Sequence, residues 1–203
     1  MAENPPSLRE RKAQLTRDEI LRAARRLFAE HGYARTSVRD IAQAAGVSAQ
    51  TVYDSVGSKQ ALVEALNDLI DEEAGVPGIA RAGVESGDAR EIAAISARIT
   101  RSILEHCGDI VRALVSGAAA EPELAAVVAE GQRRHVEGNR RVVEALERLD
   151  ALRADVEPAE AAETLAAISD FRLALVLQES YGWPLDRVES WIAATARTLL
   201  LDT

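Results

Sequence analysis

Hydrophobic residues recur every three or four positions along most of this sequence, which is the spacing of one face of an α-helix. Ile20 and Ala24 belong to such a face near the amino end, and Ile92, Ile95 and Ile99 belong to another in the middle of the chain. No segment alternates with the period of two that a half-buried strand requires, and no internal repeat is evident. The pattern predicts an all-α protein of about nine helices.

Three short helices are expected between Thr16 and Leu62. The first begins at Thr16, because Glu19 three residues later completes a capping box. It ends at Gly32, since glycine readily adopts the left-handed conformation that closes a helix. The second begins at residues 36–37, where a hydroxyl can accept the first unpaired backbone N–H groups.

A tight turn at Gly46 separates the second helix from the third. Ser48 caps the third helix, which is about two turns long and packs inward through Val52 and Val56. A short helix held behind such a turn is typical of a helix-turn-helix, in which the third helix enters the major groove of DNA.

The run TRDEILRAARRLFAEHGYARTSVRDIAQAAGVSAQTVYDSVGSKQAL resembles the amino-terminal domain of the tetracycline-repressor (TetR) family. That resemblance implies a three-helix DNA-binding domain followed by a helical domain that binds a ligand and dimerises. Family members often have a His-Phe pair one residue after the tyrosine, whereas this chain has Tyr53-Asp54-Ser55-Val56. The features that carry the resemblance are Ala24, Phe28, Gly32-Tyr33, Thr36, Ile41-Ala42, Ala45-Gly46-Val47-Ser48, Thr51, Tyr53 and Ser58-Lys59.

Charge is divided unequally along the chain. The whole sequence carries a net charge of -9, which alone would argue against general binding to nucleic acid. Up to Leu66, however, ten basic residues face eight acidic ones, so this part carries +2 and the remainder carries -11. A basic head on an acidic body can bind phosphates through one face, and its affinity for DNA should fall steeply with salt.

Three parts are expected: a flexible arm over residues 1–15, a DNA-binding domain over 16–62, and a helical ligand-binding and dimerisation domain over 63–203. With 203 residues, 47% of them hydrophobic, the chain is long enough for a core in each domain. The arm could reach a minor groove or phosphates, or remain a solvated tail. Beyond the third helix, helices are expected over 59–73, 88–107, 110–120, 122–149, 158–179 and from 184 to the end, with a polar link from about 75 to 87.

Enzymatic chemistry is not expected. His31, His106, His135 and Cys107 are not accompanied by a metal-ligand spacing, a nucleophile motif or a phosphate-binding glycine pattern, so neither a metal nor a cofactor is predicted. A single cysteine allows no internal disulfide, and neither a signal peptide nor an apolar run of about 20 residues is visible. These features favour a cytoplasmic protein that is not associated with a membrane.

The candidate DNA contacts fall into two groups. Thr36, Ser37, Tyr53 and Lys59 stand where members of the resembling family hold phosphates. Gln50 and Thr51 face the bases, since a glutamine amide can pair with adenine and a threonine methyl can contact thymine. The full set is Arg17, Thr36, Ser37, Arg39, Ser48, Ala49, Gln50, Thr51, Tyr53, Asp54 and Lys59.

Asp54 is the unexpected member of this set. A carboxylate close to phosphates lowers the affinity for DNA unless it accepts a hydrogen bond from cytosine or pairs with an arginine. Replacing it with alanine is therefore predicted to tighten binding to random DNA.

The last two helices are the expected dimer surface, because apolar residues surround the helix over 158–179 on nearly all sides. In the resembling family the final helices of two subunits form a four-helix bundle, which would place two recognition helices about one DNA turn apart on a palindrome. A monomer that buries these residues internally is the alternative. The candidate contacts are Leu165, Ile168, Phe171, Leu175, Trp191, Ile192, Thr195 and Leu199.

An effector pocket is expected among the first helices of the body, where polar residues interrupt apolar stripes. Asp170 is the foremost candidate, because a carboxylate among apolar neighbours needs a cation, a hydrogen-bond partner or a proton. Its alternative role is a salt bridge to an arginine of a second subunit. The candidates are Thr100, His106, Arg112, Ser116, His135, Asp170, Arg172 and Gln178.

Together these features predict a transcriptional regulator, a repressor that binds a palindromic operator as a homodimer and is released by a small-molecule effector. The alternative is a helix-turn-helix protein of architectural type that binds DNA without an effector. The sequence identifies neither the effector nor the operator, and it does not separate repression from activation.

Overall fold

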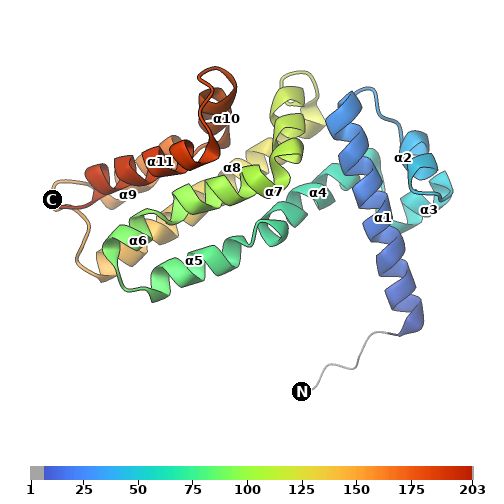
Figure 1. Cartoon of the computed structure of the whole chain (residues 1–203). Coiled ribbons are helices and arrows are strands. Elements are labelled where there is room, and N and C mark those ends of the chain that lie inside the picture. The colour runs from blue at the N-terminus through green and yellow to red at the C-terminus, as the bar shows by residue number, and fades with distance from the viewer. Residues whose placement is uncertain (1–6, 203) are drawn as a thin grey trace. The chain divides into compact units, whose positions relative to one another are not determined.

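The computed structural model describes residues 7–202, which form eleven helices and no strand (Figure 1). The all-α class predicted from the sequence is confirmed. In the described part of the chain, Leu152 and Leu201 form an isolated antiparallel β-bridge. The helices are α1 (Leu8–His31), α2 (Val38–Ala44), α3 (Ala49–Ser55), α4 (Lys59–Glu73), α5 (Val76–Glu85), α6 (Ala89–Ala93), α7 (Ile95–Gly117), α8 (Pro122–Arg148), α9 (Pro158–Ile168), α10 (Phe171–Glu179) and α11 (Leu185–Leu200).

The chain divides into two compact units. The first, called the head, comprises the residues up to Asp68 together with 112–127, and the second, called the body, comprises 69–111 and 128–203. The boundary expected near residue 62 therefore omits one part of the head, since residues 112–127, at the end of α7 and the start of α8, group with the residues up to Asp68.

The head is built on the first three helices, whose inward residues are fully buried. Ile20 of α1, Ile41 of α2, Val52 of α3 and Leu62 of α4 are all 0% exposed. Because α2 and α3 have only seven residues each, their stability comes from this shared core more than from helix propensity.

The predicted start of α1 at Thr16 is wrong. The helix begins at Leu8, where Ser7 and Glu10 form the capping box that had been expected from Thr16 and Glu19. The Thr16 hydroxyl instead donates to the carbonyl of Lys12, 3.0 Å away, inside the helix. Nothing between residues 8 and 15 interrupts helix formation, so this part of the expected arm is helical, and residues 1–6 of that arm lie outside the described residues.

The predicted polar link over residues 75–87 is also wrong, because α5 occupies most of it. Gly75 has a φ of +65° and precedes the helix, and Pro77 stands in the first turn, where its missing N–H and fixed φ cost nothing. Gly83 lets α5 approach α7 closely, since a Cβ there would lie 2.4 Å from Cγ1 of Ile95. The proline and glycines thus begin and pack a helix here.

Two other boundaries differ from expectation. Helix α7 runs through Cys107, whose φ of -130° and ψ of 17° mark a kink near the expected break. The single helix expected over 158–179 is interrupted between α9 and α10. At that point the Ser169 hydroxyl donates to the Leu165 carbonyl, 2.6 Å away, and Asp170 caps α10 by accepting from the Arg172 N–H.

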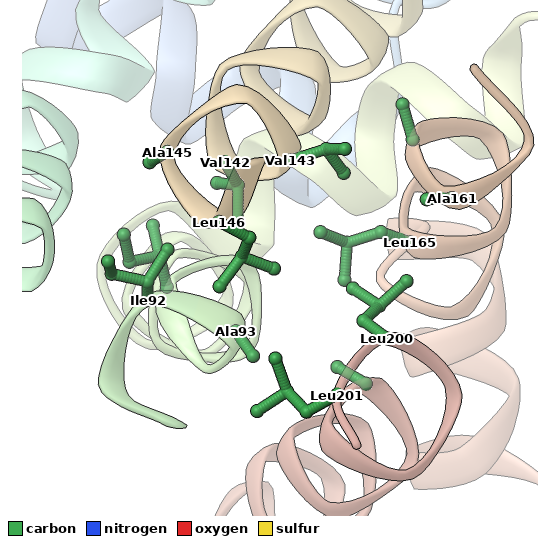
Figure 2. Packing of buried hydrophobic residues seen from close by; sticks show 13 residues of the cluster. Ile92, Ala93, Val142, Val143, Ala145, Leu146, Ala161, Leu165, Leu200 and Leu201 are labelled. Carbon is green, nitrogen blue, oxygen red and sulfur yellow. The ribbon is translucent and has the colours of Figure 1, made fainter. Parts of the chain in front are cut away.

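The body has its own core of aliphatic side chains. Leu146 and Val143 of α8 project toward Leu165 of α9 and Leu200 of α11, and these four residues are 0% or 1% exposed (Figure 2). Alanines fill the rest of the contact, including Ala93 of α6 and Ala161 of α9. Small side chains of this kind let helices approach closely, which accounts for a core with few aromatic residues.

Candidate nucleic-acid interface

Helix α3 is fixed at both ends within the head. Its first turn is capped by Ser48, whose Oγ accepts from the Thr51 N–H at 3.0 Å and lies 2.8 Å from the Thr51 hydroxyl. Its last turn is held by Arg17 of α1, which donates through Nη1 to the Ser55 carbonyl at 2.8 Å. With Val52 buried between these points, α3 is presented in one defined orientation.

The opposite face of α3 is open to solvent. Gln50 and Asp54 are exposed, and Tyr53 is 51% exposed, the condition for a helix that enters a major groove. The Gln50 amide donates to the Asp54 carboxylate at 2.8 Å, so Asp54 has a partner on its own helix. Since an amide nitrogen has two hydrogens, Gln50 keeps one donor and its oxygen for a base. Ala49 and Thr51 are half-buried beside this face.

The start of α2 offers a second contact surface. Ser37 and Asp40 form a capping box, in which the Ser37 N–H donates to the Asp40 carboxylate at 2.8 Å. Hydrogen bonds from the side chain and backbone of Ser37 lower the pKa of Asp40 below its ordinary value. Ser37 and Arg39 are exposed, so both can reach a phosphate beside the positive end of the helix.

Thr36 is placed differently from the phosphate ligand that was predicted. It is 2% exposed, and its hydroxyl lies 2.9 Å from the Gly32 carbonyl and 3.2 Å from the Leu27 carbonyl. A hydroxyl turned into the protein in this way satisfies carbonyls at the end of α1. Thr36 therefore positions α2 and is not a surface contact.

Lys59, at the start of α4, also has partners inside the head. Its Nζ lies 3.8 Å from the ring centroid of Tyr33, and the Tyr33 hydroxyl donates to the carboxylate of Glu123 at the start of α8. Burial lowers the pKa of Lys59, opposed by the nearby charges of Glu121 and Glu123. The sequence reasoning missed both glutamates, because they are more than 60 positions away along the chain.

Residues 20–66, which contain this arrangement, match the family described as bacterial regulatory proteins, tetR family. Residues 20–66 therefore form a DNA-binding domain of the tetR family. Its matched region is 44% identical over 61 residues to the transcriptional regulator TtgR of Pseudomonas putida and 39% identical over 69 residues to the regulator TcmR of Streptomyces glaucescens. These matches cover 30% and 34% of this chain and 29% and 30% of the relatives, so the chain aligns with less than a third of their length.

Solved structures with the same fold extend over nearly the whole chain. NalD, the secondary repressor of the MexAB-OprM multidrug efflux pump of Pseudomonas aeruginosa, has a TM-score of 0.69 and 21% identity, with 93% of this chain and 98% of NalD covered. SmeT, the repressor of the efflux pump SmeDEF of Stenotrophomonas maltophilia, has a TM-score of 0.72 and 21% identity, covering 94% and 92%. At this identity the likeness shows the fold alone. The relatives named here are regulators or repressors, in agreement with the prediction of a non-enzymatic chain.

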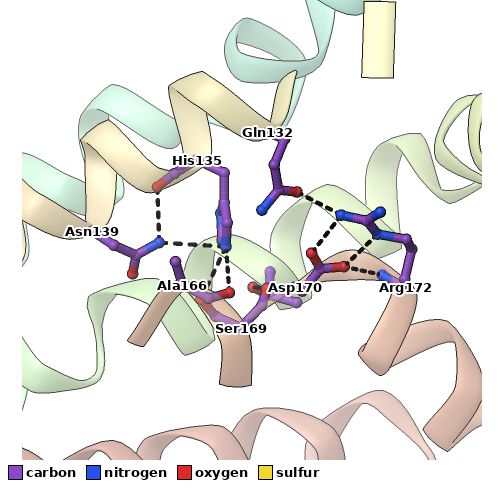
Figure 3. Close-up of polar contacts among 8 residues, drawn as sticks. Gln132, His135, Asn139, Ala166, Ser169, Asp170 and Arg172 are labelled. Atoms are coloured by element: carbon purple, nitrogen blue, oxygen red, sulfur yellow. Dashed lines mark hydrogen bonds and ion pairs between the residues drawn. The ribbon is translucent and has the colours of Figure 1, made fainter. Parts of the chain in front are cut away.

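The body contains a buried polar network that joins α7, α8 and the break between α9 and α10. Figure 3 shows the part of it that lies around His135, between α8 and that break. The Thr100 hydroxyl donates to the Ser169 carbonyl at 3.0 Å, and Ser169 Oγ lies 3.3 Å from His135 Nε2. On the other side, Asn139 donates to the His135 carbonyl at 2.8 Å and accepts from Ser96 at 2.7 Å. Of these five residues, only Thr100 and His135 had been predicted.

His135 is the centre of this network. Its Nε2 lies 3.0 Å from the Ala166 carbonyl, which can only accept, so Nε2 carries the proton. Burial lowers the pKa of His135 below its ordinary value, although the hydrogen bond to Ala166 opposes the shift. The imidazole is therefore neutral near pH 7, and its ring lies 5.6 Å from that of Phe171.

Asp170 is not the unpaired carboxylate that the sequence suggested. It accepts from the Arg172 N–H at 2.7 Å and pairs with the Arg172 guanidinium at 3.0 Å, within the same chain. Burial raises the pKa of Asp170, but the hydrogen bonds and charge of Arg172 outweigh it and bring the pKa below its ordinary value. Arg172 also donates to Gln132 at 2.9 Å. An intersubunit salt bridge is thus unnecessary to satisfy Asp170.

The other predicted pocket residues do not join this network. Arg112 and Ser116 belong to the head, and His106 is exposed on α7 with its Nδ1 2.8 Å from the Ser102 carbonyl. Gln178 of α10 has a buried Oε1 without a hydrogen-bond partner in the described chain. A buried, unsatisfied amide oxygen is costly unless a ligand or water completes it, so Gln178 remains a pocket candidate.

Three of the predicted dimer contacts are used by the chain itself. Leu165, Leu175 and Ile192 are 0%, 6% and 1% exposed, so the core of the body already covers them. Ile168, Phe171, Trp191 and Thr195 are half-buried and Leu199 is 38% exposed. Helical periodicity identified apolar faces but could not say which face a second subunit would cover.

Proposed function

We propose that this chain is a transcriptional repressor that binds a palindromic DNA operator as a homodimer and is released by a small-molecule effector. The observation that carries the proposal is the presentation of α3. Ser48, Val52 and Arg17 hold the helix rigidly, while Gln50 and Tyr53 stay open to solvent. A short helix held this way fits the width of the major groove.

DNA contacts are proposed on two levels. Gln50 and Thr51, beside Ala49, read base edges, and Asp54 orients Gln50 through their hydrogen bond. Phosphates are held by Ser37, Arg39, Ser48, Tyr53 and Lys59, with Arg17 acting from behind α3. Contacts of the second kind set the register of the protein and make its affinity dependent on salt.

Dimerisation is supported by apolar side chains that α10 and α11 leave exposed. Val176 is 47% exposed, Tyr181 lies just beyond α10 at 69%, and Leu199 of α11 is 38% exposed. Phe171 and Trp191, on the same two helices, are half-buried and add to the apolar surface that α10 and α11 expose. A second copy related by a two-fold axis would cover it and place the two α3 helices about 34 Å apart, one turn of DNA.

An effector is proposed to bind the body near the His135 network and Gln178. The network supplies neutral donors and acceptors, and Gln178 supplies an unsatisfied acceptor. SmeT, which shares the fold, has been solved in complex with triclosan, a small molecule. Such a regulator would act in the cytoplasm, where the single buried thiol of Cys107 stays reduced.

Selection of bound sequences from random DNA tests the proposal. We expect enrichment of one palindrome, and sedimentation of the complex should show two 21.8 kDa chains per duplex. Screening a library of apolar small molecules against that complex should then yield compounds that release the DNA. Enrichment of no sequence would contradict operator recognition. Operator binding that no compound weakens, by a body that binds none of them, would favour the effector-independent alternative.

A further inference from the structure

One cluster in the head is not required by the fold or by base reading. It joins Tyr33 in the loop after α1, Lys59 at the start of α4, and Glu121 and Glu123 at the start of α8, all within the head. Tyr33 is 6% exposed, and its hydroxyl donates to Glu123 while its ring receives the Lys59 ammonium 3.8 Å from the centroid. Both glutamates lie close enough to Lys59 to act on its charge.

The cluster and a DNA phosphate would therefore compete for the ammonium of Lys59. At the start of α4, an ammonium added to the positive end of the helix would serve to hold a DNA phosphate. In this structure the Lys59 side chain is half-buried and its ammonium lies over the Tyr33 ring. The negative charges of Glu121 and Glu123 attract the same ammonium. An ammonium on the Tyr33 ring gains from the ring quadrupole, and moving it to a phosphate gives up that contact.

We propose that Lys59 is shared between the Tyr33–Glu121–Glu123 cluster and a DNA phosphate, so that the start of α8 controls one phosphate contact of each subunit in the operator complex. This regulation rests on the proposed function. Helix α8 continues beyond Val127 into the body, so it connects the cluster covalently to the part of the chain that would bind an effector. A ligand that strengthens the interaction of Lys59 with Glu121 and Glu123 removes that phosphate contact and weakens operator binding.

Operator titrations over a range of salt concentrations test the sharing. The Glu121→Gln, Glu123→Gln double variant should bind the operator about three- to tenfold more tightly. Its plot of log affinity against log salt should be steeper by about 1.8, the value for one more neutralised phosphate in each of the two subunits. In a Lys59→Met background, the same glutamine substitutions should change neither quantity.

Glu64→Gln is the matched control, because Glu64 is an exposed glutamate of α4 that bonds to Gln60 and not to Lys59. It removes one negative charge from the head without touching the cluster. Its effect should be below twofold and should persist in the Lys59→Met background. The sharing is contradicted if the Glu121/Glu123 variant behaves like Glu64→Gln, or if its gain in affinity survives the loss of Lys59.

A spectroscopic measurement examines the same cluster in the free protein and in the presence of operator. The sequence contains two lysines, Lys12 and Lys59, so reductive ¹³C-methylation labels only these and the amino terminus. The Lys59 methyl signal should be shifted upfield by the Tyr33 ring, and it should move toward the Lys12 signal in the Glu121→Gln, Glu123→Gln variant and on addition of operator. A Lys59 signal that coincides with that of Lys12 in the free protein would overturn the proposal.

The two levels of proposal fail in different ways. If no DNA is selected, the proposed function fails and the sharing fails with it. If an operator is selected and bound, but the Glu121→Gln, Glu123→Gln substitutions have the same effect on affinity with and without Lys59→Met, only the sharing of Lys59 is wrong.

Discussion

Ser48→Ala removes the cap of α3. The free energy of operator binding should fall by more than the free energy of unfolding does. The substitution deletes the acceptor of the Thr51 N–H at 3.0 Å and the contact with the Thr51 hydroxyl at 2.8 Å. Loss of an N-cap of this type costs about 1 kcal/mol. Helix α3 has seven residues, so this one cap supports a large part of its first turn. For a chain of this length, ~1 kcal/mol lowers the midpoint of thermal unfolding by about 2–4 °C.

The effect on DNA should be larger because the operator complex uses two copies of α3 and because the Ser48 hydroxyl is itself a proposed phosphate contact. If the first turn frays in each subunit, the cost is counted twice, and about 2 kcal/mol corresponds to a loss of roughly 30-fold in affinity. Fluorescence anisotropy with labelled operator, alongside thermal unfolding, measures both quantities. Asp88→Ala is the matched control, since Asp88 caps the short helix α6 of the body by accepting from the Arg90 N–H at 2.8 Å.

Asp88→Ala should lower stability by a similar amount and leave operator affinity within about twofold. Ser48→Thr keeps an acceptor at the cap and should restore most of the affinity. Two results would refute the reasoning: an alanine variant that binds operator as well as the Asp88 control does, or a threonine variant that is as weak as alanine.

Three further predictions concern other parts of the chain. The pKa of His135 is lowered on folding from 6.5, so the unfolded state takes up the proton first as pH falls. Stability should therefore be full above pH 6.5 and decrease below it. His135→Gln should reduce this decrease in urea titrations, and an equal decrease in the variant would contradict the role given to the buried imidazole. Asp54→Ala should tighten binding to random DNA at fixed salt, and weaker binding would contradict the repulsion assigned to its carboxylate. Leu199→Glu should shift sedimentation toward a 21.8 kDa monomer, and an unchanged dimer would exclude Leu199 from the interface.

Local sequence patterns predicted the head well, because caps and turns depend on residues close together in the chain. Ser48 accepts the N–H three residues later, and Ser37 forms its box with Asp40, as their positions before apolar runs indicate. Gly32 has a positive φ of +79° at the end of α1. The same reasoning failed at Thr16, because a capping motif is informative only where the preceding residues cannot be helical, and residues 8–15 can.

Contacts distant in sequence could not be predicted from such patterns. Tyr33 and Glu123 are separated by 90 positions, and nothing local to either residue indicates the other. His135 was one polar candidate among eight, and only the fold brings it to Ser169, 34 positions away. Asp170 looked unpaired because Arg172, two residues away, would lie on another face of a continuous helix. The break before α10 lets Asp170 act as its cap and reach Arg172.

Base reading by α3 is tested most directly by comparing the sequences selected by the wild-type protein and by Gln50→Ala. The account predicts a palindrome whose half-sites are centred about 10 base pairs, or a multiple of this, apart. It also predicts that Gln50→Ala loses its preference at one base in each half-site while the remaining positions persist. Identical sequence profiles for the two proteins, or enrichment without two-fold symmetry, would contradict it.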